Sequence, residues 1–141
     1  MKPTEKPTPE PTFTLSFDSD GGSACDPMNF KFGAAIDSTK LPTPTRDGYA
    51  FDGWKDVPST MPANDLTLTA LWKVNTYTIT FNSDGGSACD PMTFKFGAVI
   101  KSDSLPKPTR EGYSFAGWKD VPSTMPANDL TLTALWKVNT Y

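Results

Sequence analysis

Apolar and polar residues alternate in short segments of the chain, and each of these segments occurs twice. Residues 13–17 alternate strictly between large apolar and polar side chains, and residues 66–72 place Leu66, Leu68, Ala70 and Trp72 on one face, which is the pattern of a strand with one buried face. Residues 28–32 alternate in the same way and place Met28, Phe30 and Phe32 on one face. Together with the aromatic segment 49–54, these patterns predict four strands in each copy.

Glycine-rich and proline-rich segments separate the predicted strands. Residues 18–23 contain two glycines and predict a turn between the first two strands. Pro42 and Pro44 exclude a regular helix through the second half of residues 33–45, so we expect an extended crossover with at most one or two helical turns. Prolines also predict a loop over residues 58–65. The expected order is strand, strand, crossover, strand, loop, strand.

The repetition defines the expected domains. Residues 14–77 and 78–141 align without a gap and differ at twelve positions, all of which lie between residues 15 and 52 of the first copy. We predict a Pro/Thr-rich linker over residues 1–12, a first module over 13–76 and a second over 77–141, whose last residues begin a further repeat. A module of this size is near the lower limit for an independent core.

Aromatic residues are therefore the main candidates for the core of each module. We expect core positions for six of them: Phe17, Trp54, Trp72, Phe81, Trp118 and Trp136. Trp54 and Trp118 follow a glycine at the end of a predicted strand, so we expect partial exposure there and treat both as candidate ligand contacts. Gly48 and Gly112 are expected to be turn glycines.

Composition excludes several functions. The net charge of −3 and the absence of a basic run disfavour nucleic acid as a partner. The chain has no histidine, which removes the commonest general base, the triads that depend on it and most zinc sites. We therefore expect no enzyme activity, no catalytic residue, no cofactor and no metal ion. No apolar segment is long enough to span a bilayer, so any membrane attachment would need an anchor outside this sequence.

Residues 18–21 resemble the start of a calcium-binding loop, but the resemblance ends there. Ser23 and Asn29 stand where an EF-hand requires its glycine and its bidentate glutamate. We interpret the segment as a turn.

Cys25 and Cys89 occupy equivalent positions in the two copies. A module of this size is roughly 25–30 Å across, whereas a disulfide requires Cα atoms within about 7 Å. In an end-to-end array the two cysteines cannot reach each other. We expect half-buried free thiols that are candidate reactive groups, and an inter-chain bridge, a lipid or a metal role stays open.

Several motifs in a fixed order carry a resemblance to a known family. In the second copy these are the strand 77–81, Asn82 to Gly86, Pro-Thr-Arg-Glu-Gly-Tyr-Ser-Phe-Ala-Gly-Trp at 108–118, and Asp-Leu-Thr-Leu-Thr-Ala-Leu-Trp at 129–136. They resemble the Listeria–Bacteroides repeat, the family of the internalin B B-repeat. The resemblance covers nearly all of residues 13–137. Cysteine is a departure from the family pattern.

The resemblance implies a mainly β, small α+β fold: two tandem β-grasp, ubiquitin-like modules in a secreted or wall-anchored bacterial protein. We expect an extracellular location, at the cell surface or secreted. The expected function is a non-catalytic spacer and adhesion module whose partners are adjacent repeats and a host surface protein or glycan. The alternative is a carbohydrate- or host-receptor-binding module that uses the loops 58–65 and 122–129, with Asp65 and Asp129 as candidate ligand contacts.

Overall fold

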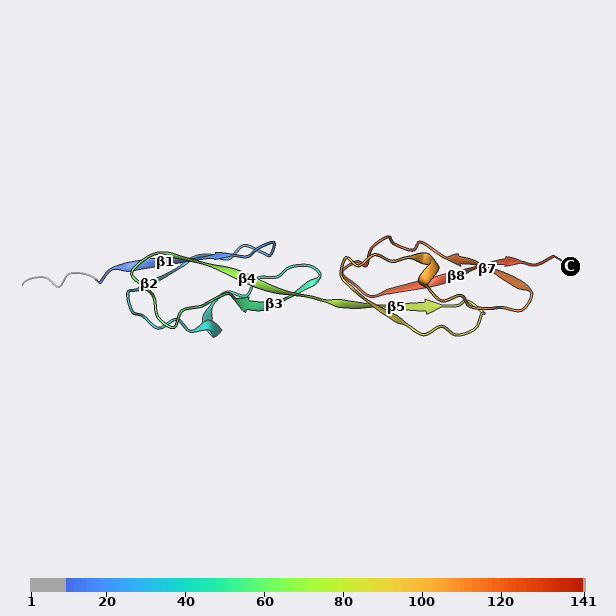
Figure 1. The fold of residues 1–141 in the computed structure, drawn as a ribbon, viewed down its shortest axis with the longest axis horizontal. Helices are drawn as coiled ribbons and strands as arrows, with labels where there is room; N and C mark the ends of the chain where they lie inside the picture. The colour runs from blue at the N-terminus through green and yellow to red at the C-terminus, as the bar shows by residue number, and fades with distance from the viewer. Residues whose placement is uncertain (1–9, 141) are drawn as a thin grey trace, which may run out of the picture. The chain divides into compact units, whose positions relative to one another are not determined.

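The computed structural model describes residues 10–140, which form two compact units (Figure 1). Unit 1 joins the chain up to Arg46 with Ala50–Lys73, and unit 2 joins Asp47–Tyr49 with the chain from Val74 onward. Most of the expected linker, residues 1–9, lies outside the described residues, and the first strand begins at Thr12. The module boundaries drawn from the sequence stay a prediction.

The first four strands form one sheet. They are β1 (Thr12–Asp18), β2 (Met28–Lys31), β3 (Tyr49–Trp54) and β4 (Leu66–Val74), in the spatial order β2-β1-β4-β3. β1 is antiparallel to β2 but parallel to β4, and Leu15 stands opposite Leu66. The first and last strands of the repeat are thus the two central strands of its sheet.

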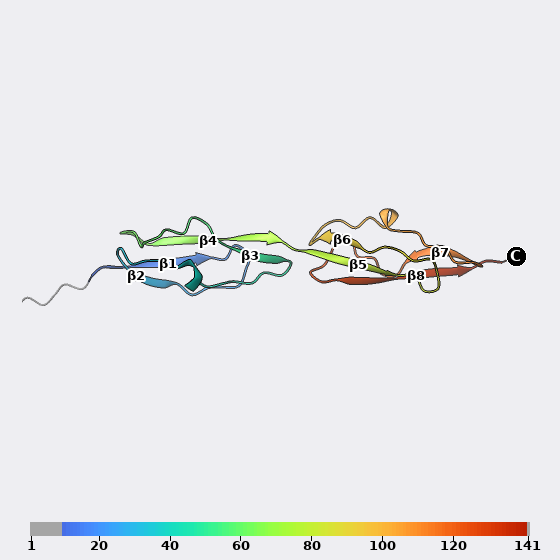
Figure 2. The ribbon, with the colours of Figure 1, turned by 90° about the horizontal axis from the view of Figure 1, so that it is seen from below.

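The second sheet repeats this arrangement with β5 (Thr76–Asn82), β6 (Met92–Lys95), β7 (Tyr113–Trp118) and β8 (Leu130–Val138). The order is β6-β5-β8-β7, again with β5 antiparallel to β6 and parallel to β8 (Figure 2). A β-bulge between Phe115 and Gly117 shifts the register of β7 against β8. The mainly β class and the four strands per copy that the sequence predicts are confirmed.

The crossovers contain one short 3-10 turn each, at Ser38–Lys40 and Ser102–Ser104. The Asp37 carboxylate caps the first turn by accepting hydrogen bonds from the Thr39 backbone N (3.0 Å) and hydroxyl (2.6 Å). Lys101 stands at that position in the second copy and makes no side-chain cap. The two crossovers therefore share a path but differ in how their turn is held.

Each copy has its own apolar core. Leu15 is fully buried in β1, and Leu68 and Ala70 of β4 pack beside it. The crossover contributes Ile36 and Leu41 to the same cluster. The second copy buries the equivalent cluster: Ile79, Phe81, Ile100, Leu105, Trp118, Met125, Leu132 and Ala134. Among the described residues, no polar or charged residue is buried.

Phe32 contradicts the sequence expectation. It was placed with Met28 and Phe30 on one apolar face, but β2 ends at Lys31 and the Phe32 side chain is 58% exposed. Gly33 follows with a φ of +77°, so the chain turns away before Phe32 can reach the core. Met28 and Phe30 do pack against the core cluster.

Candidate functional surfaces

Trp54 and Trp118 are core residues rather than surface rings. Each is 8% exposed, so the partial exposure expected from the sequence is not found. The indole N–H of Trp54 donates to the Pro42 carbonyl at 2.9 Å, and Trp118 does the same to Pro106. A buried indole needs such a partner for its N–H. These two tryptophans tie β3 and β7 to the crossovers.

Four rings of the first copy form a connected row: Phe17, Trp54, Phe51 and Trp72. Neighbouring ring centroids in this row are 4.9, 5.3 and 5.6 Å apart, with tilted or edge-to-face geometry. Such geometry is favourable for aromatic pairs. The expected core role of these rings is consistent with this packing, although Phe17 and Trp72 are only partly buried.

The second tryptophan of each copy explains the Gly-Gly pair in the first turn. A Cβ at Gly22 would lie 2.4 Å from the Trp72 ring, so no larger residue fits without movement. The Trp72 indole N–H also donates to the Ser19 carbonyl at 2.8 Å. The turn over residues 18–23 therefore packs directly against the indole ring of Trp72, which comes from the last strand of the repeat.

Asp65 and Asp129 have a structural partner. The Asp65 carboxylate accepts a hydrogen bond from the Thr14 backbone N–H at 2.8 Å, and Asp129 accepts the same bond from Thr78. Each aspartate therefore fastens the start of the last strand to the first strand. Asp65 and Trp54 contact different parts of the fold, so the structure does not join them in one site.

The loops 58–65 and 122–129 are held by a residue that the sequence analysis missed. Met61 is 1% exposed, and its backbone N–H donates to the Ala34 carbonyl at 2.9 Å. Its carbonyl accepts from Gly33 at 2.9 Å. The only sequence signal for this anchor is one large apolar residue in an otherwise polar loop. Met125 is held in the same way in the second copy.

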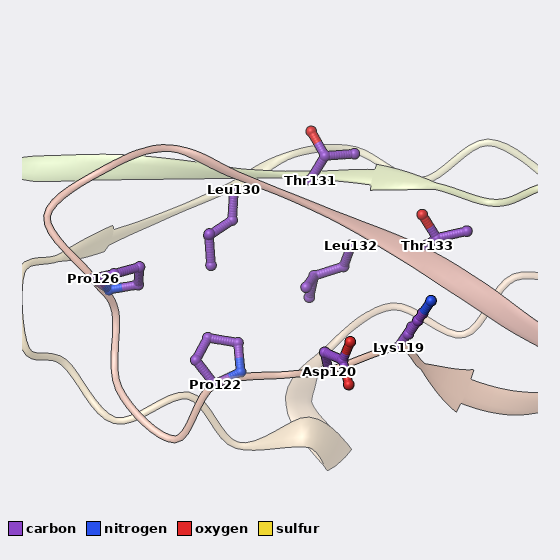
Figure 3. A pocket seen from close by; sticks show the side chains of 8 residues that line it. All are labelled: Lys119, Asp120, Pro122, Pro126, Leu130, Thr131, Leu132 and Thr133. Carbon is purple, nitrogen blue, oxygen red and sulfur yellow. The ribbon is translucent and has the colours of Figure 1, made fainter.

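A hollow of about 410 Å³ lies beside the second of these loops. Figure 3 shows that Leu130 and Leu132 of β8 face it, with Pro122 and Pro126 on the opposite side. Lys119 and Asp120 stand at one end and supply a charge of each sign. No aromatic ring lines this hollow, so it offers apolar contact and a polar end rather than a stacking platform.

Cys25 and Cys89 are half-buried free thiols that pack against the two cores. Partial burial raises the pKa of the Cys25 thiol above its ordinary value, and the neighbouring Asp26 carboxylate adds to this. Cys89 has a raised pKa for the same reasons, with Asp90 as the neighbour. A thiol with a raised pKa holds less thiolate at neutral pH, which lowers its reactivity.

Residues 10–140 contain neither a metal-binding cluster of side chains nor a membrane-spanning helix. In that part of the chain no three His, Cys, Asp or Glu side chains gather closely enough to hold a metal ion. In the same residues no helix is both long enough and apolar enough to cross a membrane.

Comparison with protein families gives two matches in this chain. The model of the Listeria-Bacteroides repeat domain matches residues 13–71 and again residues 77–135. The two matches follow the two copies seen in the sequence and in the sheets.

Three known proteins are similar over most of this chain. Internalin H of Listeria monocytogenes is 32% identical over an alignment of 148 positions that covers 90% of this chain and 25% of that protein. Two proteins of Evansella cellulosilytica, provisionally named as membrane proteins, are 30% and 29% identical over 92% of this chain. The chain spans between 17% and 25% of the length of these relatives.

One solved structure is similar over its whole length. It contains domains 3 and 4 of the Streptococcal High Identity Repeats in Tandem from a cell surface protein. The match covers 91% of this chain and 98% of that one at 20% identity, with a TM-score of 0.30. A score this low supports no argument about fold or function.

Proposed function

Because the chain belongs to the Listeria–Bacteroides repeat family, we propose that it is a non-catalytic spacer and adhesion module of a bacterial cell-surface or secreted protein. The family membership carries the assignment to a tandem repeat, and the sequence without histidine is in keeping with a non-catalytic role. Neighbouring repeats are its first partners, and a host surface protein or glycan is the proposed external partner.

The parallel pairing of the first and last strands is the observation that carries the spacer function. β1 enters the sheet at Thr12 and β4 leaves it at Val74, and the two strands lie side by side (Figure 1). Tension on the two ends of a repeat pulls parallel neighbours in opposite directions along their length. All hydrogen bonds of that ladder are then loaded together, instead of one after another.

The same strand arrangement supports the finer assignment of each repeat to a β-grasp. The second sheet has a central parallel pair and two outer antiparallel strands, which is the arrangement that the ubiquitin-like resemblance implies. The crossover differs from that expectation because its helical part is a single 3-10 turn. We assign the repeat to a reduced β-grasp on this basis.

Single-molecule force spectroscopy tests the spacer function by comparing two pulling directions in the same chain. Cys25→Ser and Cys89→Ser remove the native thiols, and Glu10→Cys with Val74→Cys, or Glu10→Cys with Lys31→Cys, then supplies the thiols that carry the handles. The first pair loads β1 against β4 along the strands. The second pair opens the β1–β2 hairpin from its end, where Thr12 stands opposite Lys31.

We expect a severalfold higher unfolding force for the first pair, with roughly 200 Å of chain released as the repeat extends. Forced unfolding reports the unfolding rate under load, so the comparison reads mechanical resistance directly. Equal forces in the two directions would contradict a spacer role based on the parallel pair.

The hollow of Figure 3 favours a second candidate function, which is binding of a carbohydrate or host receptor by the loop 122–129. Lys119→Ala with Asp120→Asn removes both charges of the polar end, and asparagine suits the left-handed backbone of Asp120, whose φ is +55°. Binding on a glycan array or to host-cell proteins that disappears in this variant, with an unchanged melting temperature, supports the candidate. Unchanged binding contradicts it.

A further inference from the structure

The phenylalanine that ends the β5–β6 hairpin covers a turn from an earlier part of the chain. Unit 2 contains Asp47–Tyr49, and within this unit the Phe96 ring lies against Gly48. A Cβ at Gly48 would lie 2.4 Å from two atoms of that ring, so only glycine permits the contact. The rings of Tyr49 and Phe96 are 5.7 Å apart at 74°, which is edge-to-face packing.

Backbone hydrogen bonds hold both sides of this contact in place. The Gly48 carbonyl accepts from the Asn75 N–H at 2.9 Å, and the Asn75 carbonyl accepts from the Phe96 N–H at 2.9 Å. Asn75 stands between β4 and β5, so one residue joins the turn to the phenylalanine. We call the packing of Phe96 on Gly48 and Tyr49 the Phe96 contact.

The phenylalanine and the Gly-Tyr turn of this contact each occur once more in the chain, as Phe32 and as Gly112–Tyr113, and neither of these has the other component beside it. Phe32 is the equivalent of Phe96 and its side chain is 58% exposed, whereas Phe96 is partly buried. Gly112 is the equivalent of Gly48, and a Cβ there would meet no atom within 4 Å. Val138 near this end is 63% exposed, whereas its equivalent Val74 is partly buried.

The Gly112 half has the backbone arrangement of the complete contact, whereas the Phe32 half has only part of it, because Pro11 stands in the place of Asn75 and has no N–H to donate. The Gly112 carbonyl accepts from the Asn139 N–H at 2.9 Å, as Gly48 does from Asn75. The Phe32 N–H donates to the Pro11 carbonyl at 3.0 Å, as Phe96 does to Asn75. Gly112 also keeps a φ of +83°, close to the +82° of Gly48. The backbone of the Gly112 half therefore needs little rearrangement to accept a partner, and the Arg110 guanidinium, 3.8 Å from the Tyr113 ring centroid, is the side chain that lies beside the site.

We propose that the Gly112–Tyr113 turn is a docking surface for a following repeat of the same kind in the same polypeptide. Gly112–Tyr113 is covered by the phenylalanine of a repeat that follows, in the way that Phe96 covers Gly48–Tyr49. This inference deepens the spacer function by naming the surface that an adjacent repeat uses. The test of the docking surface measures a local contact, whereas the test of the spacer function measures resistance to force. The docking proposal and the spacer function can therefore fail independently.

The test uses the full chain with a copy of residues 14–77 added directly after Tyr141. The added sequence continues the repeat in register and supplies a second Phe32 at the position expected to cover Gly112. NMR spectroscopy follows the α-protons of Gly112, whose Glu-Gly-Tyr context occurs once in the extended chain. Protons held against the face of an aromatic ring move upfield, so this signal reports the contact directly.

We expect the Gly112 α-protons to move upfield when the repeat is added and to return when Phe32→Ala is made in the added copy alone. Val99→Ala is the matched control, because Val99 is 67% exposed and the first repeat already has Ala35 at that position. This control should leave the Gly112 signal in its upfield position. The indole N–H signals of the added copy show in the same spectra that it is folded.

The chain without the added repeat provides the reference for the size of the upfield shift, because it already contains the Phe96 contact. The Gly48 α-protons should be upfield in it and should lose that shift in Phe96→Ala, while Gly112 is unaffected. A Gly112 signal that stays unchanged beside a folded added repeat overturns the proposal. A shift of Gly112 that appears in the original chain only as its concentration rises also overturns it, because the occupant is then a second molecule.

Discussion

At the scale of single residues, close approaches between distant parts of a repeat explain why small side chains stand where they do. Gly86 faces the Trp136 ring so closely that an added Cβ would lie 2.4 Å from it. Its own backbone does not have a positive φ, so space and not conformation requires the glycine there.

We therefore predict that Gly86→Ala lowers the free energy of unfolding by roughly 1–3 kcal/mol through overpacking. The same substitution should cost less in a Trp136→Phe background, because phenylalanine lacks the ring atoms nearest to Gly86. Urea denaturation of the four chains of this double-mutant cycle measures the coupling. Equal costs in the two backgrounds would show that the ring is not the reason for the glycine.

The two cysteines give a prediction about pH. A raised thiol pKa leaves less thiolate at a given pH, and thiolate is the form that reacts. Alkylation by iodoacetamide at pH 8 should be slower in the folded chain than in urea, and the difference should narrow as the pH rises past the raised pKa. Mass spectrometry of labelled peptides follows both sites. Faster alkylation of the folded chain would contradict the burial of these thiols.

At the same scale, Asp37 gives a second prediction about pH. Hydrogen bonds from the Thr39 hydroxyl and backbone N–H favour the carboxylate and lower the pKa of Asp37. The stabilisation of the 3-10 turn is present above the ordinary pKa of aspartate and is lost as the pH falls through the lowered value. An NMR titration should find Asp37 below the ordinary range, and a value within or above that range would refute the capping bond.

At the scale of elements, the alternation of residues was sufficient to place the strands but not to pair them. The segment 49–54 was predicted with the bounds that β3 has, and the last strand extends only two residues beyond the prediction, to Val74. Phe32 was misplaced because alternation continues past the point where the Gly33 turn ends β2. The alternation of apolar and polar residues within a strand does not indicate the residue at which the strand ends.

The candidate site residues were harder to predict because their partners are distant in the sequence. The glycine before Trp54 suggested exposure, yet the indole is covered by the crossover and donates to Pro42. Asp65 looked like a loop carboxylate available to a ligand, but its partner is Thr14, 51 positions away. Contacts of this range depend on the register of β1 with β4, which no local pattern contains.

The bond between Asp65 and Thr14 gives a prediction about β1 and β4. Asp65→Ala removes the acceptor that holds the Thr14 N–H, and we expect a loss of about 1 kcal/mol in the free energy of unfolding. Asp52→Ala is the control, since alanine stands at the equivalent position 116 of the second repeat. It should change stability by less than about 0.5 kcal/mol. Equal effects of the two substitutions in urea denaturation would contradict the role of Asp65.

At the scale of the whole molecule, each copy has a separate apolar cluster, so damage to one core should remain local. Leu15 is fully buried, and Leu15→Ala should cost about 2–5 kcal/mol in the first repeat. Calorimetry should then resolve an early transition for that repeat and a much smaller shift for the other. Ile79→Ala should give the reverse pattern. A single transition that moves as a whole would contradict two separate cores.

The central parallel pair also has a consequence for how the chain reaches its native fold. β4 and β8 have the same sequence, so β1 meets two identical candidates for its neighbour during folding. The chain from Asp18 to Leu66 is less than half as long as the chain from Asp18 to Leu130, and this difference in loop closure favours the native partner by only about 0.7 kcal/mol. We therefore expect a minority of refolding molecules to pair β1 with β8 first and to correct the exchange slowly. The near identity of the repeats thus makes strand exchange the main kinetic error of such an array.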